Sequence, residues 1–291
     1  MVYNILLVKQ FLHHKNMNAI QKYSNIHFTT VNSIEECNDL SLYDGVFSPS
    51  TIIDVSKYPN TKFIFGPHFS VIPNDFIHTI NGPNTIYIQP SQWVIDFWKL
   101  YPICDQFNIQ CLPFGVDTEK FLPSSCGNGN SNINEKSKVF IYFKGRKPQE
   151  LQFLVDYLNT NNIEFRIFNY RQRYNEQEYI DYLQACKYGI WLDAHESQGF
   201  ALEEALSCNV PLLVWNVSTL NQEDGYTYPD YKATSIPYWD ASCGEVFYND
   251  HEFENIYKLF LSRLDGYHPR KYILENLSID VCEKQFIELL K

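Results

Sequence analysis

The sequence has 291 residues, which suits one large domain or two modest ones, each with its own hydrophobic core. Its composition, 45% hydrophobic and 20% charged, is that of a globular protein and excludes a disordered chain. The formal net charge of −11 excludes a general nucleic-acid binder, because such proteins need a broad basic face to displace counterions.

Short apolar runs alternate with amphipathic segments over residues 1–122, which we take as an N-terminal domain. Buried strands are expected at 3–8, 26–31, 45–47, 62–65, 85–89 and 109–112. Helices are expected at 15–23, 33–39 and 91–100. The last of these begins at Ser91, a good N-cap, and its aromatic stripe is typical of a core-facing helix. Residues 123–137, rich in Gly, Ser and Asn, are predicted to form a linker.

The same alternation restarts over residues 138–291, the predicted C-terminal domain. Strands are expected at 139–143, 163–168, 189–193 and 211–215. Helices are expected at 149–158, 176–186 and 199–207, and from 252 to 291 with a break near 266–269. Repeated βα units predict a parallel sheet covered by helices. The fold class is therefore α/β, with two Rossmann-like parallel-sheet domains facing a cleft and ligands at the carboxyl ends of the strands.

The segment from Leu192 to Trp215 concentrates the polar residues expected of a site. It contains a strand, the polar loop 195–198 and a helix that begins near Gly199. The free N–H groups and the positive dipole end of that helix form an anion site. Glu196 in the loop and Glu204 in the helix are poor partners for phosphate but good acceptors for sugar and ribose hydroxyls.

A basic cluster follows the first strand of the second half. Lys144, Arg146 and Lys147 lie where the strand 139–143 ends. An arginine fork suits phosphate oxygens, and positive charge there would stabilise a departing diphosphate.

These motifs, in this order, resemble the retaining GT-B glycosyltransferases of glycosyltransferase family 4, the group 1 type. Glu196 and Glu204 match the E-x7-E signature of that family, although Gln198 stands where Phe is usual. The segment 112–121 is similar to its P-x-G-V-D-x-x-x-F pattern, and the strand ending in Gly145-Arg146 is similar to its Gly-Arg. The resemblance covers most of the chain and is vague before residue 85.

The resemblance implies a nucleotide-sugar donor held by the C-terminal domain. It assigns the donor sugar to Glu196, the ribose to Glu204 and the diphosphate to the amides of 198–200, which include Gln198, Gly199 and Phe200. Lys144, Arg146 and Lys147 would supply cations, and His195 would donate to a phosphate or cap the helix. The base is expected near 168–170. His68, which follows a strand of the N-terminal domain, would lie near the reacting sugar and join Glu196 as a catalytic residue.

The function that follows is transfer of a sugar from a nucleotide-sugar to an unknown acceptor (a glycan, lipid or small molecule), with retention of configuration. No cofactor and no metal are expected, since the Asp-x-Asp pair and zinc-type spacings are absent. Two alternatives stay open: a GT-B nucleotide-sugar epimerase, and a non-catalytic sugar-nucleotide or glycan-binding relic. Because the N-terminal run is too short for a signal peptide and no stretch spans a bilayer, we expect a cytoplasmic protein that binds no nucleic acid. Peripheral membrane contact through a local basic patch is left open.

Overall fold

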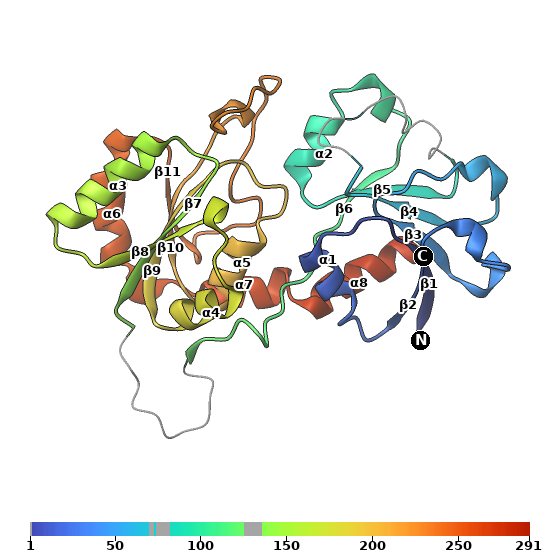
Figure 1. Cartoon of the computed structure of the whole chain (residues 1–291), viewed down its shortest axis with the longest axis horizontal. Helices are drawn as coiled ribbons and strands as arrows, with labels where there is room; N and C mark the ends of the chain where they lie inside the picture. The colour runs from blue at the N-terminus through green and yellow to red at the C-terminus, as the bar shows by residue number, and fades with distance from the viewer. Residues whose placement is uncertain (1, 70–72, 74–81, 125–135) are drawn as a thin grey trace. The chain divides into compact units, whose positions relative to one another are not determined.

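The chain folds into two α/β units, each built on one parallel sheet (Figure 1). One unit comprises Met1–Gly115 together with Leu277–Lys291, and the other comprises Val116–Asn276. The predicted fold class of two Rossmann-like parallel-sheet domains is confirmed. The structure, a computed structural model, describes residues 2–69, 73, 82–124 and 136–291.

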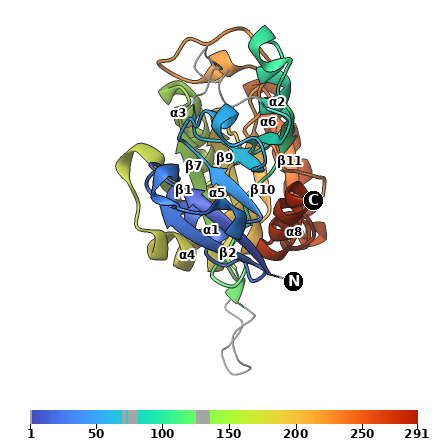
Figure 2. The ribbon, with the colours of Figure 1, turned by 90° about the vertical axis from the view of Figure 1, so that its right-hand side faces the viewer.

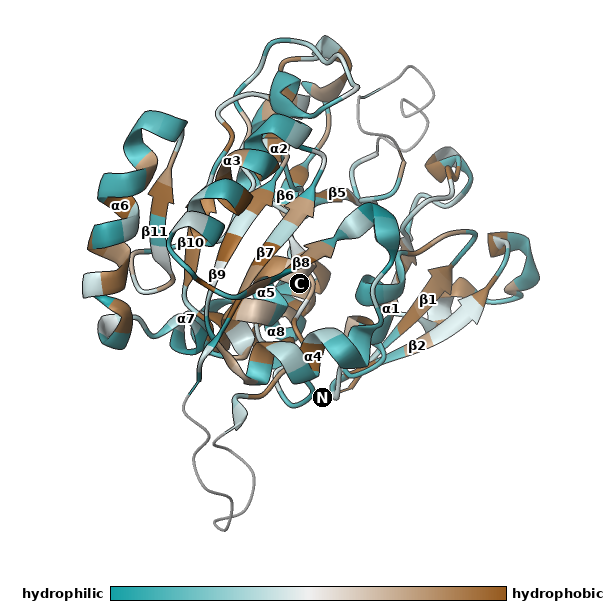
Figure 3. Cartoon of the chain, turned by 60° about the vertical axis from the view of Figure 1, so that its left-hand side comes forward, coloured by the Kyte–Doolittle hydropathy of each residue, from teal (hydrophilic) through white to brown (hydrophobic). Residues whose placement is uncertain are grey.

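The first unit holds a six-stranded sheet in the order β2-β1-β3-β4-β5-β6, with every pair parallel. Its strands are β1 (Tyr3–Val8), β2 (Ile26–Val31), β3 (Gly45–Ser48), β4 (Phe63–Phe65), β5 (Thr85–Gln89) and β6 (Ile109–Cys111). Its helices are α1 (His14–Ile20), α2 (Gln92–Trp98) and α8 (Ile279–Leu290). Figure 3 shows the inner strand β1 in brown and the edge strand β2 paler, as expected when only inner strands are covered on both faces.

The last helix, α8, belongs to the first unit although it ends the chain (Figures 1 and 2). The ring of Phe286 meets the rings of Phe28 and Phe47 edge-on, at centroid distances of 5.8 and 5.5 Å. At the start of α8, a Cβ added to Gly115 would lie 2.5 Å from the Cα of Ile279, so only glycine permits this approach. The division of the chain thus differs from the predicted 1–122, 123–137 and 138–291.

The second unit holds a five-stranded parallel sheet in the order β11-β10-β9-β7-β8. Its strands are β7 (Lys138–Lys144), β8 (Phe165–Asn169), β9 (Cys186–Asp193), β10 (Leu212–Trp215) and β11 (Gly244–Phe247). Its helices are α3 (Pro148–Thr160), α4 (Glu176–Gln184), α5 (Phe200–Ser207), α6 (Asp250–Ser262) and α7 (Pro269–Asn276).

Alternate side chains of β7 pack on opposite faces of the second sheet. Val139 and Ile141 pack in a cluster with Leu154 of α3 and Phe253 of α6. Phe140, which points to the opposite face, meets Tyr179 of α4 edge-on at 6.3 Å. Helices therefore cover both faces of the sheet, as the period-two alternation of a buried strand requires (Figure 1).

Three local expectations differ from the structure. The predicted helix 33–39 is only a 3₁₀ turn at Ile34–Glu36, because Ile34 is the one buried residue of that turn and no apolar stripe holds a longer helix. The strand β11 was not expected. Ser91 occupies the N-cap of α2, but its hydroxyl makes no capping hydrogen bond.

The predicted linker 123–137 lies mostly outside the described residues. Of the seven described cysteines, all are free thiols, and five are buried. In the described part of the chain, no helix combines the length and the apolar character needed to cross a membrane.

Candidate functional site

Three neighbouring strands of the second unit end at the same edge of its sheet. Lys144 ends β7, Asp193 ends β9 and Trp215 ends β10. Lys144 and Asp193 are partners in the register, and the N–H of Ala194 donates to the carbonyl of Lys144 at 3.0 Å. Because ligands of parallel α/β sheets bind at this edge, the segments that follow these strands form the candidate site.

An ion pair joins the first two of these segments. The Nζ of Lys144 contacts the Oε1 of Glu196, the carboxylate predicted to bind the donor sugar. The two side chains are 26% and 17% exposed, so solvent still reaches both groups. The same Nζ lies 4.8 Å from the ring centroid of Tyr170. Within the segment predicted for the base, Tyr170 is exposed whereas Phe168 is buried, so Tyr170 is the aromatic ring that a ligand can reach.

The turn between β9 and α5 has the shape predicted for an anion site. Gly199 is the N-cap of α5 with φ +92° and ψ +48°, a left-handed conformation that favours glycine. The helix begins at Phe200, which is half-buried, and its first N–H groups lack partners within the helix. Gln198 and Glu204 are each only 4% exposed. The turn thus brings the predicted residues together, and their roles toward a donor stay predictions.

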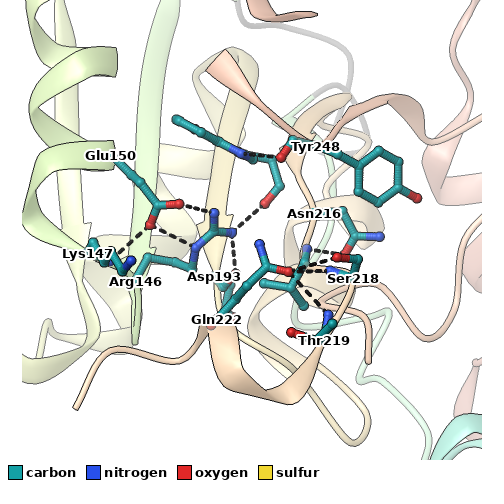
Figure 4. Close-up of polar contacts among 11 residues, drawn as sticks. Arg146, Lys147, Glu150, Asp193, Asn216, Ser218, Thr219, Gln222 and Tyr248 are labelled. Carbon is teal, nitrogen blue, oxygen red and sulfur yellow. Dashed lines mark hydrogen bonds and ion pairs between the residues drawn. The ribbon is translucent and has the colours of Figure 1, made fainter. Parts of the chain in front are cut away.

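Arg146, predicted to bind the donor diphosphate, is instead buried and hydrogen-bonded within the second unit. Its side chain has no exposed surface, and its Nε donates to Oε2 of Glu150 at 3.0 Å. Its Nη1 donates to the carbonyls of Asp193 and Trp215 at 3.2 and 2.9 Å (Figure 4). The guanidinium therefore ties α3 to the ends of β9 and β10, and this position does not support the prediction that Arg146 binds the diphosphate.

Lys147 differs from Arg146 in exposure. Its side chain is exposed at the N-cap of α3, and its backbone N–H donates to Oε2 of Glu150 at 3.0 Å (Figure 4). Of the three predicted cations, Lys144 and Lys147 therefore keep surface that a ligand can reach.

His195 contacts a carboxylate that the sequence did not single out. Its Nδ1 lies 3.6 Å from Oε2 of Glu223, to which the hydroxyl of Tyr228 donates at 2.9 Å. The rings of His195 and Tyr228 meet edge-on at 5.2 Å. Burial lowers the pKa of His195, the charge of Glu223 opposes that shift and the charge of Lys144 reinforces it. A neutral imidazole therefore lies beside the Lys144–Glu196 pair.

A buried asparagine anchors the loop that carries Glu223 and Tyr228. The Oδ1 of Asn216 accepts from the N–H and hydroxyl of Ser235 at 2.8 and 2.9 Å and from the hydroxyl of Thr234 at 3.1 Å. The carbonyl of Thr234 in turn accepts from the N–H of Glu196 at 3.0 Å. Asn216 directly follows β10, so its place after a strand was a usable signal, whereas nothing local marks Glu223.

Asp193 is a second residue that the sequence did not single out. It is 1% exposed, and burial raises its pKa from 3.8 to about 6, although the charges of Lys144 and Arg146 oppose the shift. Within the described residues its Oδ1 has no hydrogen-bond partner. A buried carboxyl group whose pKa is raised to about 6 therefore lies next to the ammonium of Lys144.

His68 lies in the first unit, after β4. The Nδ2 of Asn16 donates to its Nε2 at 3.2 Å, and the ring of Phe11 meets it edge-on at 5.3 Å. Burial lowers the pKa of His68 to about 4, so the imidazole is neutral and accepts through Nε2. Phe11 itself is 56% exposed and is fixed through its N–H, which donates to the hydroxyl of Ser50 at 2.8 Å.

Over the ranges that the structure describes, no group of three or more His, Cys, Asp or Glu side chains has an arrangement that would hold a metal ion.

Comparison with known proteins identifies the architecture. No protein-family model matches the sequence, and no curated protein matches it. Among solved structures, the chain is similar to a sucrose-phosphate synthase from Thermosynechococcus elongatus, with a TM-score of 0.58, 9% identity and coverage of 99% of this chain and 98% of that one. It is similar to the N-terminal domain of a Candida albicans trehalose-6-phosphate phosphatase, with a TM-score of 0.58, 9% identity and coverage of 100% and 97%.

It is also similar to WaaG, a glycosyltransferase involved in lipopolysaccharide biosynthesis, with a TM-score of 0.56, 10% identity and coverage of 99% of both chains. Structural similarity at identities this low shows the fold alone, and it confirms the predicted GT-B fold class of two Rossmann-like domains.

Proposed function

We propose that this chain is a glycosyltransferase that moves a sugar from a nucleotide-sugar donor to an acceptor. The observation that carries the proposal is the convergence of Lys144, Glu196 and the amino end of α5 at one edge of the second sheet. The GT-B fold supports it, because two of the similar solved structures are described as a galactosyltransferase and a glycosyltransferase. The E-x7-E spacing of Glu196 and Glu204 supports it from the sequence.

The Lys144–Glu196 ion pair fits a donor of this kind. A diphosphate offers anionic oxygens to the ammonium of Lys144, and the sugar offers hydroxyl donors to the carboxylate of Glu196. A nucleotide-sugar would therefore replace one ion pair with two complementary contacts. Lys144, with the exposed Lys147, would stabilise the charge that builds on the leaving diphosphate, while the amides at the start of α5 bind its oxygens.

The remaining parts of the proposal follow from the resemblance and from the first unit. Glu204 holds the ribose, Tyr170 flanks the base, and the anomeric configuration is retained. His68, held neutral with its Nε2 accepting from Asn16, would donate a hydrogen bond through its Nδ1–H to the acceptor or the sugar. The reaction needs neither a metal nor a cofactor, and it would take place in the cytoplasm.

The first experiment is a thermal-shift panel with UDP, GDP, ADP and their common sugar conjugates. We expect a clear increase in unfolding temperature for one base with wild type. The increase should be at least halved in Glu204→Ala, because loss of a buried hydrogen bond to a ligand costs about 1–2 kcal/mol. Each variant is compared with its own ligand-free unfolding temperature, so that a change in stability is not mistaken for a change in binding.

Glu254→Ala serves as the matched control, because Glu254 is an exposed residue of α6 in the same unit. Its ligand shift should equal that of wild type. Product analysis then separates the alternatives: transfer to an added acceptor supports the proposal, an epimerised donor without acceptor supports the epimerase, and binding without turnover supports the relic. No shift with any nucleotide contradicts the transferase and the epimerase and leaves the non-catalytic glycan-binding relic.

A further inference from the structure

A buried glutamate next to Glu204 contacts the donor-site turn twice. Glu203, in the first turn of α5, is 0% exposed. Its N–H donates to the carbonyl of Gly199 at 3.0 Å, and its Oε2 accepts from the Nε2 of Gln198 at 3.1 Å. Gln198 is itself 4% exposed. One residue of the helix therefore holds both residues of the turn that precedes Phe200, through its backbone and through its side chain.

The chemistry of Glu203 is unusual for a helix interior. A carboxyl group at this depth is expensive to bury unless it is neutral and hydrogen-bonded. Burial raises the pKa of Glu203 well above its usual value, the hydrogen bond from Gln198 opposes this shift, and the charge of the neighbouring Glu204 adds to it. Burial therefore favours the protonated form of Glu203, and its Oε1 has no hydrogen-bond partner within the described residues. A leucine or methionine would fill the same space without this desolvation cost, so packing alone does not account for a glutamate here.

We propose that Glu203 is a positioning residue that, through Gln198, fixes the turn at Gly199 and thereby aims Glu196 and the first amides of α5 at the donor. The inference rests on the proposed function, because the donor is what the turn would be aimed at. The side-chain carboxamide of Gln198 is held by Glu203 inside the unit, so this side chain contributes to the site indirectly, by fixing the turn. Removal of the acceptor on Glu203 would take away one contact that holds Gln198 and would thereby loosen the backbone that presents the N–H groups.

The test compares four variants of the full chain: Glu203→Gln, Glu203→Met, the double variant Gln198→Met/Glu203→Met, and Glu283→Met. The last is the matched control, since Glu283 is 3% exposed and hydrogen-bonded but lies on α8 of the first unit. Three quantities are measured: the unfolding temperature, hydrogen exchange of the amides of 197–201 without ligand, and the dissociation constant of the best nucleotide.

We expect Glu203→Gln to behave as wild type, because a carboxamide still accepts from Gln198. Glu203→Met should speed exchange in the turn and raise the dissociation constant about tenfold, as expected for one lost buried hydrogen bond. The double variant should recover unfolding temperature, because both polar groups are gone, and yet keep the raised dissociation constant. Glu283→Met should lower the unfolding temperature alone.

Two results would overturn the proposal. In one, Glu203→Met changes only the unfolding temperature, as Glu283→Met does. In the other, the double variant regains wild-type affinity together with its stability, which would make Glu203 a packing residue. If wild type binds no nucleotide, the proposed function fails by itself, and unchanged exchange in the turn of Glu203→Met would then still refute the positioning role.

Discussion

The ionisation of Asp193 affects both the stability of the protein and the candidate site. Its folded pKa is raised from 3.8 to about 6 by burial, so the folded protein holds the proton more tightly than the unfolded chain. Stability therefore falls as pH rises between these values, and the full cost of about 3 kcal/mol is present above pH 6. We expect Asp193→Asn to raise the free energy of unfolding by about that amount at pH 8 and by little at pH 4. Urea unfolding at both pH values, followed by fluorescence, measures the difference.

The control for this prediction is Asp250→Asn, because Asp250 is a half-exposed acid in the first turn of α6. Its effect should be small at both pH values. An equal effect of Asp193→Asn at pH 4 and pH 8 would mean that the carboxyl is not titrating in this range. If the proposed function holds, the same residue also bears on donor binding, since ionised Asp193 would compete with a diphosphate for the charge of Lys144.

At the scale of elements, the start of α5 depends on one backbone conformation. Gly199 has φ +92°, and a Cβ at this position would lie 3.6 Å from the Cβ of Glu196, an ordinary contact. The penalty for Gly199→Ala is therefore backbone strain rather than a clash, about 1 kcal/mol. We expect a matching loss of stability and a smaller thermal shift with the nucleotide, because the first amides of the helix move.

Gly266→Ala is the matched change, since Gly266 has an ordinary φ and nothing lies within 4 Å of an added Cβ. It should alter neither stability nor binding. If Gly199→Ala changes neither stability nor binding, the turn adapts without cost and its left-handed conformation is not what shapes the predicted anion site.

At the scale of the whole molecule, the two ends of the sequence share one unit. We expect Phe286→Ala in α8 to cost the first unit about 3–5 kcal/mol, because it removes a fully buried ring that contacts β2 and β3. Hydrogen exchange should speed up in β1, β2 and β3 while β7 and β9 keep their protection.

Phe253→Ala supplies the opposite case, since its ring is buried in the α3–α6 core of the second unit. Phe253→Ala should speed hydrogen exchange in β7 and β9 and leave exchange in β1 unchanged. If Phe286→Ala instead speeded hydrogen exchange in β7, α8 would belong with the second unit, as the predicted boundary at residue 138 implied.

The sequence by itself determined the features that depend on local pattern. Apolar runs of strand length marked ten of the eleven strands, because the inner strands of a parallel sheet are covered on both faces and its edge strands are still covered in part. The spacing of Glu196, Gly199 and Glu204 located the turn and the helix after it, since a helix start needs specific residues at fixed positions. The missed strand, β11, is a short edge strand with the weaker pattern Gly-Glu-Val-Phe.

Only the tertiary structure decided which partners these residues meet. Arg146 follows its strand as a phosphate-binding arginine would, yet the carbonyls of Asp193 and Trp215 bury it. Glu223 contacts His195 although it lies 28 positions later in the sequence. The helix α8 packs in the first unit although the whole second unit precedes it in the sequence. Contacts between residues far apart in the chain leave no periodic trace in the sequence, because they depend on where folding brings each segment.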